Sequence, residues 1–207
     1  MMRAFGILAV AALAMPVATA AADNAVTVYG GYRGGGGFTD VSTGQSLNLE
    51  DSGAIAASLD FAMDASRQYQ FFVSYQDTKI QNVPTTTGGA AASGNSLPTS
   101  VTYFHVGGTN FFAGQIGKGG YVVGGIGATL FQPSQSGYSS EWRPSMNIGL
   151  GYQWPLGEQV ALRAEVRGYV TLVNSDGQFF CSGGCVVSIK GDAFTQGEAL
   201  IGLSARF

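Results

Sequence analysis

Eight extended runs of residues account for most of the chain, and apolar and polar side chains alternate along most of them. Alternation with a period of two is typical of a β-strand whose two faces meet different surroundings. Each run has about ten residues or slightly more, the length that a tilted strand needs to cross a bilayer. The runs are residues 25–34, 53–63, 69–78, 101–112, 120–131, 143–154, 159–172 and 193–207. They predict an all-β protein.

The connections between these runs alternate strictly between long and short. In chain order they are residues 35–52, 64–68, 79–100, 113–119, 132–142, 155–158 and 173–192, beginning and ending with a long one. A transmembrane barrel with an even number of strands has short periplasmic turns, longer outer loops and both chain ends in the periplasm. A soluble β-sandwich has no reason to sort its loops by length. The order therefore predicts an eight-stranded antiparallel up-and-down transmembrane β-barrel.

The two faces of the best-patterned runs differ in polarity. Residues 159–172 carry valine and leucine on one face and arginine, glutamate and tyrosine on the other. Residues 143–154 and 69–78 repeat this division, with Phe72 out of pattern, whereas the fourth and fifth runs hold too much glycine for their faces to be assigned. The lumen of so small a barrel is narrow and just filled by side chains. The large apolar set, which includes Trp, Tyr and Phe, therefore suits a lipid-facing band, and the polar face is predicted to point inward.

The first 22 residues have the features of a secretory signal peptide. Arg3 precedes an apolar core, and small residues follow that allow cleavage after residue 20 or 22. Such a segment is removed and takes no part in the fold. The remaining residues, 23–207, suit one domain, and no apolar run among them approaches the roughly 20 residues of a membrane helix.

Composition narrows the functional classes. Charged residues make up 11% of the chain and glycine accounts for 32 residues, whereas ordinary soluble domains hold roughly 25% charged residues. Without Arg3 the chain has 9 basic and 13 acidic residues, a net charge of −4. That balance gives no electrostatic footprint for nucleic acid. A chain this poor in charge is either a glycine-rich secreted β-domain or a protein whose outer surface faces something other than water.

Both cysteines lie in the stretch "FFCSGGCVV", as Cys181 and Cys185. An exported chain passes through an oxidising compartment, so this pair is predicted to form a short structural disulfide in the last long connection. Two thiols and a single distant histidine make a poor zinc site. We therefore expect neither a metal nor a cofactor.

The signal peptide, the eight runs, "LRAEVRGY" in the seventh run and the terminal "GLSARF" together resemble the small eight-stranded outer-membrane β-barrels of Gram-negative bacteria, the type of the OmpA transmembrane domain, OmpX and OmpW. The resemblance implies a monomer in the bacterial outer membrane, with both termini periplasmic, surrounded by lipid and lipopolysaccharide. It also implies assembly by periplasmic chaperones and the barrel-assembly machinery. In that family the C-terminal aromatic residue, here Phe207, belongs to the assembly signal.

Charged residues on the predicted inward faces form the main candidate site. Charges in a narrow lumen must be paired, because an unpaired buried charge is costly. The network would act either as a structural core that closes the barrel or as a gate or narrow polar pore, and the sequence does not separate these. We expect a structural and surface-interaction barrel, with a narrow channel for small or apolar solutes, as in OmpW-like members, as the alternative. The predicted lumen residues are Arg33, Asp60, Arg163, Glu165, Arg167, Glu198 and Arg206.

A specific pairing follows if the last two runs form a symmetric hairpin. Leu172 then lies opposite Ala193, and Arg167 falls opposite Glu198 on the inward face. Because the first strand closes the barrel against the last, Arg33 would approach Glu198 from the other side. Glu198 is therefore predicted to be an acceptor shared by two arginines.

An enzymatic role is the third alternative. Some small outer-membrane barrels modify lipid A with a histidine, a serine and a carboxylate near the outer rim, and His105 is the only histidine of this chain, with Ser100 close in sequence. A serine nucleophile also needs its base within hydrogen-bond reach and a third group that orients the base. Nothing around His105 resembles the local motifs of those enzymes. We therefore expect no enzymatic activity.

Overall fold

The computed structural model describes residues 23–40, 46–81, 96–135, 139–173, 178–179, 187–190 and 193–207. The predicted signal peptide and its cleavage site lie outside the described residues, as do Cys181 and Cys185. No helix in the described ranges is long and apolar enough to cross a membrane.

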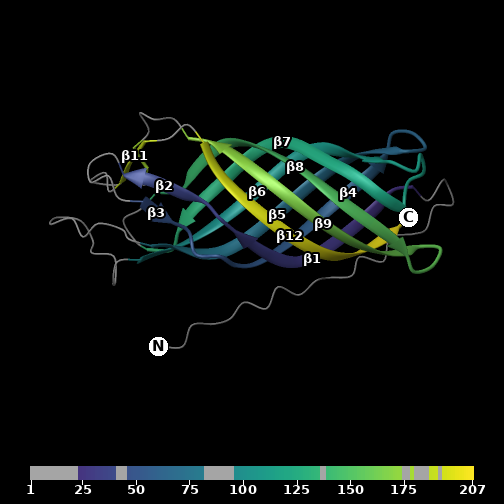
Figure 1. Ribbon diagram of the computed structural model, residues 1–207, viewed down its shortest axis with the longest axis horizontal. Helices are drawn as coiled ribbons and strands as arrows, with labels where there is room; N and C mark the ends of the chain where they lie inside the picture. The colour runs from purple at the N-terminus through teal and green to yellow at the C-terminus, as the bar shows by residue number, and fades with distance from the viewer. Residues whose placement is uncertain are drawn as a thin grey trace.

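Eight long strands of the described chain close into an antiparallel barrel in the order β1-β12-β9-β8-β7-β6-β5-β4 (Figure 1). They are β1 (Ala25–Gly34), β4 (Ser52–Ala62), β5 (Arg67–Gln81), β6 (Ser96–Phe111), β7 (Gly119–Pro133), β8 (Glu141–Pro155), β9 (Val160–Leu172) and β12 (Ala193–Arg206). Each barrel strand pairs with its neighbours in chain order, and β1 closes the ring against β12. The predicted up-and-down barrel is confirmed, and each predicted run is one of its strands.

Several strands continue beyond the predicted runs, toward the long connections. β6 begins at Ser96 rather than at residue 101, because Ser96 still pairs with Gln81 at the end of β5. Main-chain pairing does not require side-chain alternation, so the amphipathic pattern ends before the ladder of hydrogen bonds does.

A second, four-stranded sheet in the order β10-β11-β2-β3 was not predicted. Its strands are β2 (Gly37–Asp40), β3 (Ser46–Asn48), β10 (Gln178–Phe179) and β11 (Val187–Lys190), and they belong to the first and last long connections. Figure 1 shows β2, β3 and β11 at the end of the barrel opposite the C-terminus. The strands have at most four residues, too few for alternation to be recognised.

The predicted division of faces is confirmed in the best-patterned strands. In β9 the side chains from Ala161 to Thr171 alternate between buried and outward positions, and the buried set holds every charged residue of the strand. On the outer face, aromatic side chains lie toward both strand ends, for example Tyr32 toward the long connections and Trp154 toward the short turns. Phe72, which breaks the alternation of β5, lies inside the barrel with 4% of its surface exposed.

Candidate functional site: the barrel lumen

Six of the seven predicted lumen residues are buried, and the described part of the chain joins them into three ion pairs. Arginine Nη and carboxylate oxygen atoms are 2.8 Å apart in the Arg33–Glu198 pair and in the Arg163–Asp60 pair, and 2.6 Å apart in the Arg167–Glu165 pair. Each of the six residues is at most 3% exposed. Positive and negative charges therefore balance one to one within the lumen.

The Arg33–Glu198 pair lies on the side of the long connections, and we call its surroundings the loop-side cluster (Arg33, Ser74, Tyr103, Tyr169 and Glu198). Glu198 accepts hydrogen bonds from Arg33 Nε at 3.1 Å, from Ser74 Oγ at 2.7 Å and from the hydroxyl of Tyr169. The Tyr103 and Tyr169 rings stack with centroids 4.1 Å apart, and the guanidinium of Arg33 lies over both. This cluster combines one ion pair with an aromatic stack.

The other two ion pairs form the turn-side cluster (Asp60, Arg163, Glu165 and Arg167), nearer the short turns. Gln70 links the two pairs, because its Nε2 donates to Asp60 at 2.7 Å and its Oε1 accepts from Arg167 Nη2 at 2.8 Å. All four charged groups are thus connected through side-chain contacts.

Two inward tyrosines add donors to the same cluster. The hydroxyls of Tyr29 and Tyr121 donate to Glu165 Oε1 at 2.7 and 2.6 Å. The Tyr121 ring packs against Gly151 of β8, where any larger side chain would overlap the ring. Sequence reasoning missed these tyrosines, although Tyr29 and Tyr121 both occupy inward positions of their strands.

Apolar side chains lie beyond the charged clusters in both directions. Near the short turns, Ile116 of the turn between β6 and β7 is 4% exposed and clusters with Phe111, Tyr121 and Val123. Near the long connections the buried apolar side chains include Leu47, Leu97, Val101, Phe131 and Phe194. Buried apolar side chains therefore lie on both sides of the charged clusters, and we call these two groups the apolar layers.

The predicted register of the last hairpin is observed, since Ala193 pairs with Leu172 and Glu198 with Arg167. The predicted sharing of Glu198 is only half correct. Arg33 pairs with it, but Arg167 pairs with Glu165 on its own strand. On the turn side the Arg167 guanidinium lies 3.7 Å from the centroid of the Phe72 ring and donates to Gln70 Oε1. The break in alternation at Phe72 was the one sequence signal of this contact.

Arg206 belongs to neither cluster, which corrects its assignment to the lumen network. It is the last residue of β12, so its guanidinium reaches the short turn at residues 156–159 and donates from Nη2 to the carbonyl oxygen of Glu158 at 2.8 Å. Arg206 therefore fastens the barrel rim to a turn.

No protein-family model matches the chain, and no curated protein matches it either. Among solved structures, it is similar to Neisserial surface protein A, with a TM-score of 0.51 and 13% identity over 89% of this chain and 97% of that chain. It is also similar to AlkL, solved by solid-state NMR in lipid bilayers, with a TM-score of 0.51 and 15% identity over 93% of this chain and 95% of that one. OprG from Pseudomonas aeruginosa aligns with a TM-score of 0.49 and 9% identity, over 89% and 96%.

The chain has the fold of the small outer-membrane β-barrels. The identities are low, so the likeness concerns the architecture and does not assign a ligand or an activity. In this barrel, Phe207 follows β12 directly, faces outward with 39% of its surface exposed, and donates its backbone N–H to the carbonyl oxygen of Asn24 at 3.0 Å. The final residue is thus fixed to the barrel wall.

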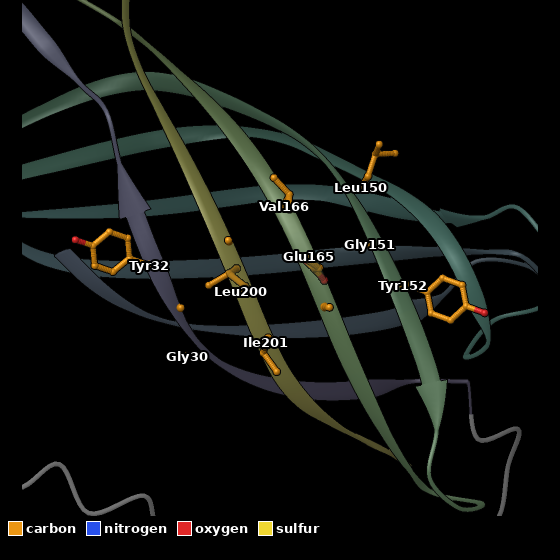
Figure 2. Close-up of a pocket in the computed structure, with 12 residues that line it drawn as sticks. Gly30, Tyr32, Leu150, Gly151, Tyr152, Glu165, Val166, Leu200 and Ile201 are labelled. Atoms are coloured by element: carbon orange, nitrogen blue, oxygen red, sulfur yellow. The ribbon is translucent and has the colours of Figure 1, made fainter. Parts of the chain in front are cut away.

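The outer face of the barrel is hollowed across β1, β12, β9 and β8, with a pocket volume of about 560 Å³ (Figure 2). Tyr32 and Tyr152 lie at opposite ends of the pocket, and Leu150 and Val166 line it between them. Glu165 borders the pocket, but its carboxylate is directed into the lumen, where it is hydrogen-bonded. This pocket is a largely apolar surface, and apart from the hydroxyls of Tyr32 and Tyr152 its lining directs no group for acid–base chemistry into it.

His105 lies inside the barrel and is 3% exposed. Its Nε2 is 3.0 Å from Ser145 Oγ rather than beside Ser100, and its Nδ1 has no hydrogen-bond partner among the described residues. A serine–histidine contact without a third, orienting group is an incomplete catalytic arrangement. Within the same described ranges, no group of three His, Cys, Asp or Glu residues could hold a metal ion.

Proposed function

We propose that the protein is a bacterial outer-membrane barrel with a structural and surface-interaction role, whose filled lumen closes the barrel while the outer connections are displayed. The observation that carries this proposal is the balanced set of interior ion pairs, with an apolar layer on either side. A closed barrel is one of the few structures that satisfy every backbone group within hydrocarbon. The apolar outer face, with aromatic side chains toward both ends, fits that environment.

The loop lengths support a direction in the membrane. Because short turns are typical of the periplasmic side and long loops of the outer side, we propose that both termini lie in the periplasm. The outer face would contact lipid and lipopolysaccharide, and Phe207 would be recognised by the barrel-assembly machinery after delivery by periplasmic chaperones. The isolated barrel has no unpaired strand edge in its ring, which suits a monomer.

The alternative function is a narrow channel for small or apolar solutes. It would need a continuous path past both charged clusters and both apolar layers. Planar-bilayer conductance and liposome swelling, measured at neutral pH on the purified mature protein, distinguish the two functions. We expect both signals to stay at the level of protein-free membranes, with a general porin as the positive control. Discrete channel events or sugar-dependent swelling would contradict the closed barrel and support the channel function.

Location is tested separately from permeability. We expect the protein to fractionate with outer membranes, and to migrate faster on gels without heating than after boiling, as closed barrels do. Recovery as a soluble periplasmic protein would overturn the outer-membrane proposal whatever the conductance.

We propose no enzymatic role. Lipid A would meet the outer face of the barrel, whereas the His105 and Ser145 side chains are buried within its wall. Lipid A extracted from cells with and without the protein, compared by mass spectrometry, should be identical. A mass difference that depends on His105 would contradict this.

A further inference from the structure

The surroundings of His105 are unusual for a titratable side chain. It is the only histidine in the chain, it lies on β6, and it reaches Ser145 on β8 across the intervening strand. The residue between them in the sheet is Gly127 of β7, which pairs with both His105 and Ser145 and has no side chain. The imidazole is thus built into the wall of the lumen with one nitrogen hydrogen-bonded to a neutral hydroxyl.

The rings that pack on His105 belong to the loop-side cluster. Its centroid lies 5.6 Å from that of Tyr103 and 5.8 Å from that of Tyr169, and both pairs are stacked. The Arg33 guanidinium lies 4.7 and 5.4 Å from the centroids of the same two rings. The stack therefore already carries one cation.

Among the residues that the structure describes, none of the groups facing His105 would balance a second cation. The charged side chains near it are Arg33 of β1 and Arg167 of β9, both positive. The adjacent strands β5 and β7 contribute Phe72 and Gly127, and β8 contributes Ser145, and all three are uncharged. The buried acids of the described chain, Asp60, Glu165 and Glu198, each pair with an arginine.

We propose that His105 is an acid-sensitive switch, which keeps the loop-side cluster closed while it is neutral and loosens it when it is protonated. The inference rests on the filled lumen of the proposed function. A buried positive charge without a partner is costly, so uptake of a proton by His105 would favour arrangements in which the imidazole leaves its buried position. Histidine is the side chain whose charge ordinarily changes in mildly acidic conditions.

The contacts around Tyr103 show where the change would be transmitted. The Tyr103 hydroxyl donates to Gln196 Oε1 at 2.8 Å, and Gln196 Nε2 donates to the carbonyl oxygen of Gly35 at 3.2 Å. Gly35 is the first residue after β1, where the chain enters the first long connection. Displacement of the tyrosine stack would therefore break a hydrogen-bonded contact to that connection. The contact lies at the end of the barrel that a surface partner would meet.

The test compares the wild-type barrel with His105→Gln, which keeps a hydrogen-bonding group for Ser145 and takes no proton. Both proteins share every interior carboxylate, so the titration of those acids cancels in the comparison. We expect the wild-type protein to lose stability against urea relative to His105→Gln as the pH falls from 8 to 4.5. Hydrogen exchange should accelerate in the loop-side halves of β6 and β9 and around residues 33–36, and not near the short turns. Because His105 is the only histidine, its imidazole NMR signals report protonation without assignment.

Parallel stability curves for the two proteins would overturn the switch, and so would an imidazole that takes up its proton with no change in exchange. If His105→Gln does not assemble, His105→Phe, which keeps a stacked ring, replaces it in the same comparison. Conductance at neutral pH would instead count against the closed barrel itself, so the two proposals fail by different measurements.

Discussion

Glu165 and Val166 are neighbours in β9, yet they lie on opposite faces of the barrel wall. Glu165 is 3% exposed and accepts hydrogen bonds from Tyr29, Tyr121 and Arg167. Val166 is 64% exposed on the outer face and lines an apolar pocket. The interior position needs particular partners at hydrogen-bond distance, whereas the outer position needs only an apolar side chain of suitable size. The interior is therefore stabilised by specific residue pairs, whereas the exterior requires only side chains of apolar type.

The largest loss of stability is expected from Glu165→Gln. Arg167 would remain buried without a carboxylate, so the free energy of unfolding should fall by about 3–5 kcal/mol. Urea unfolding of the protein inserted in vesicles can be followed by the fluorescence of Trp142 and Trp154, which face outward. The matched control is Glu158→Gln on an exposed turn, which should change stability by less than about 0.5 kcal/mol. Equal losses in both variants would show that the interior pair is not special.

The second-largest loss of stability is expected from a charge on the outer face. Val166→Arg places an arginine on the outer side of the same strand, at a cost of about 2–4 kcal/mol if the position lies near the middle of the bilayer. Val166→Leu is the control, and its stability should stay close to that of the wild type. An arginine tolerated as well as leucine would mean that this face meets water instead of hydrocarbon.

The same contrast explains what the sequence predicts well. In strands such as β8 and β9, apolar side chains face outward and polar side chains face the lumen. Because successive side chains point to opposite faces, a period of two predicts which residues point inward and which point outward. The register of the last hairpin also follows from its symmetry, and Glu198 does lie opposite Arg167.

Interior partners do not follow from alternation, because side chains from distant strands meet across the lumen. Arg33 and Ser74 converge on Glu198 from β1 and β5, and no pattern within β12 indicates them. The facing positions of Arg167 and Glu198 predict a pair between them, but Arg167 instead pairs with Glu165 and lies over Phe72, on a strand far from both in the barrel order. Arg206 was misassigned for a related reason, since inward parity alone does not reveal that the strand has reached the rim.

A smaller loss is expected from Tyr121→Phe, which removes one of the donors to Glu165. The ring should keep its packing against Phe111, whose centroid is 4.9 Å away, and Tyr29 continues to donate to the same oxygen atom. The loss should therefore be about 1.5 kcal/mol, the lower end for a hydrogen bond to a charged group. Tyr152→Phe on the outer face is the control and should have little effect. If Tyr121→Phe costs as little as the control, the interior hydroxyl is dispensable.

The smallest effect concerns a charge that belongs to neither face. Asp64 lies in the short turn between β4 and β5, where its carboxylate accepts hydrogen bonds from the Arg67 guanidinium at 2.6 Å and from the backbone N–H groups of Ser66 and Arg67. The hydrogen bond from the Arg67 side chain, and to a smaller extent those from the backbone, lower the pKa of Asp64 to about 2.

A carboxyl group whose pKa is lowered on folding contributes stability at pH values above its ordinary pKa near 3.9, and that contribution is lost as the pH falls toward 2. The stability difference between wild type and Asp64→Asn should therefore be small and constant above about pH 5, decline between about pH 5 and pH 2, and be lost near pH 2. Because the carboxylate is exposed, salt should reduce the difference further. A difference that persists unchanged at pH 2, or one as large as that of Glu165→Gln, would show that this turn matters to the barrel through something other than its charge.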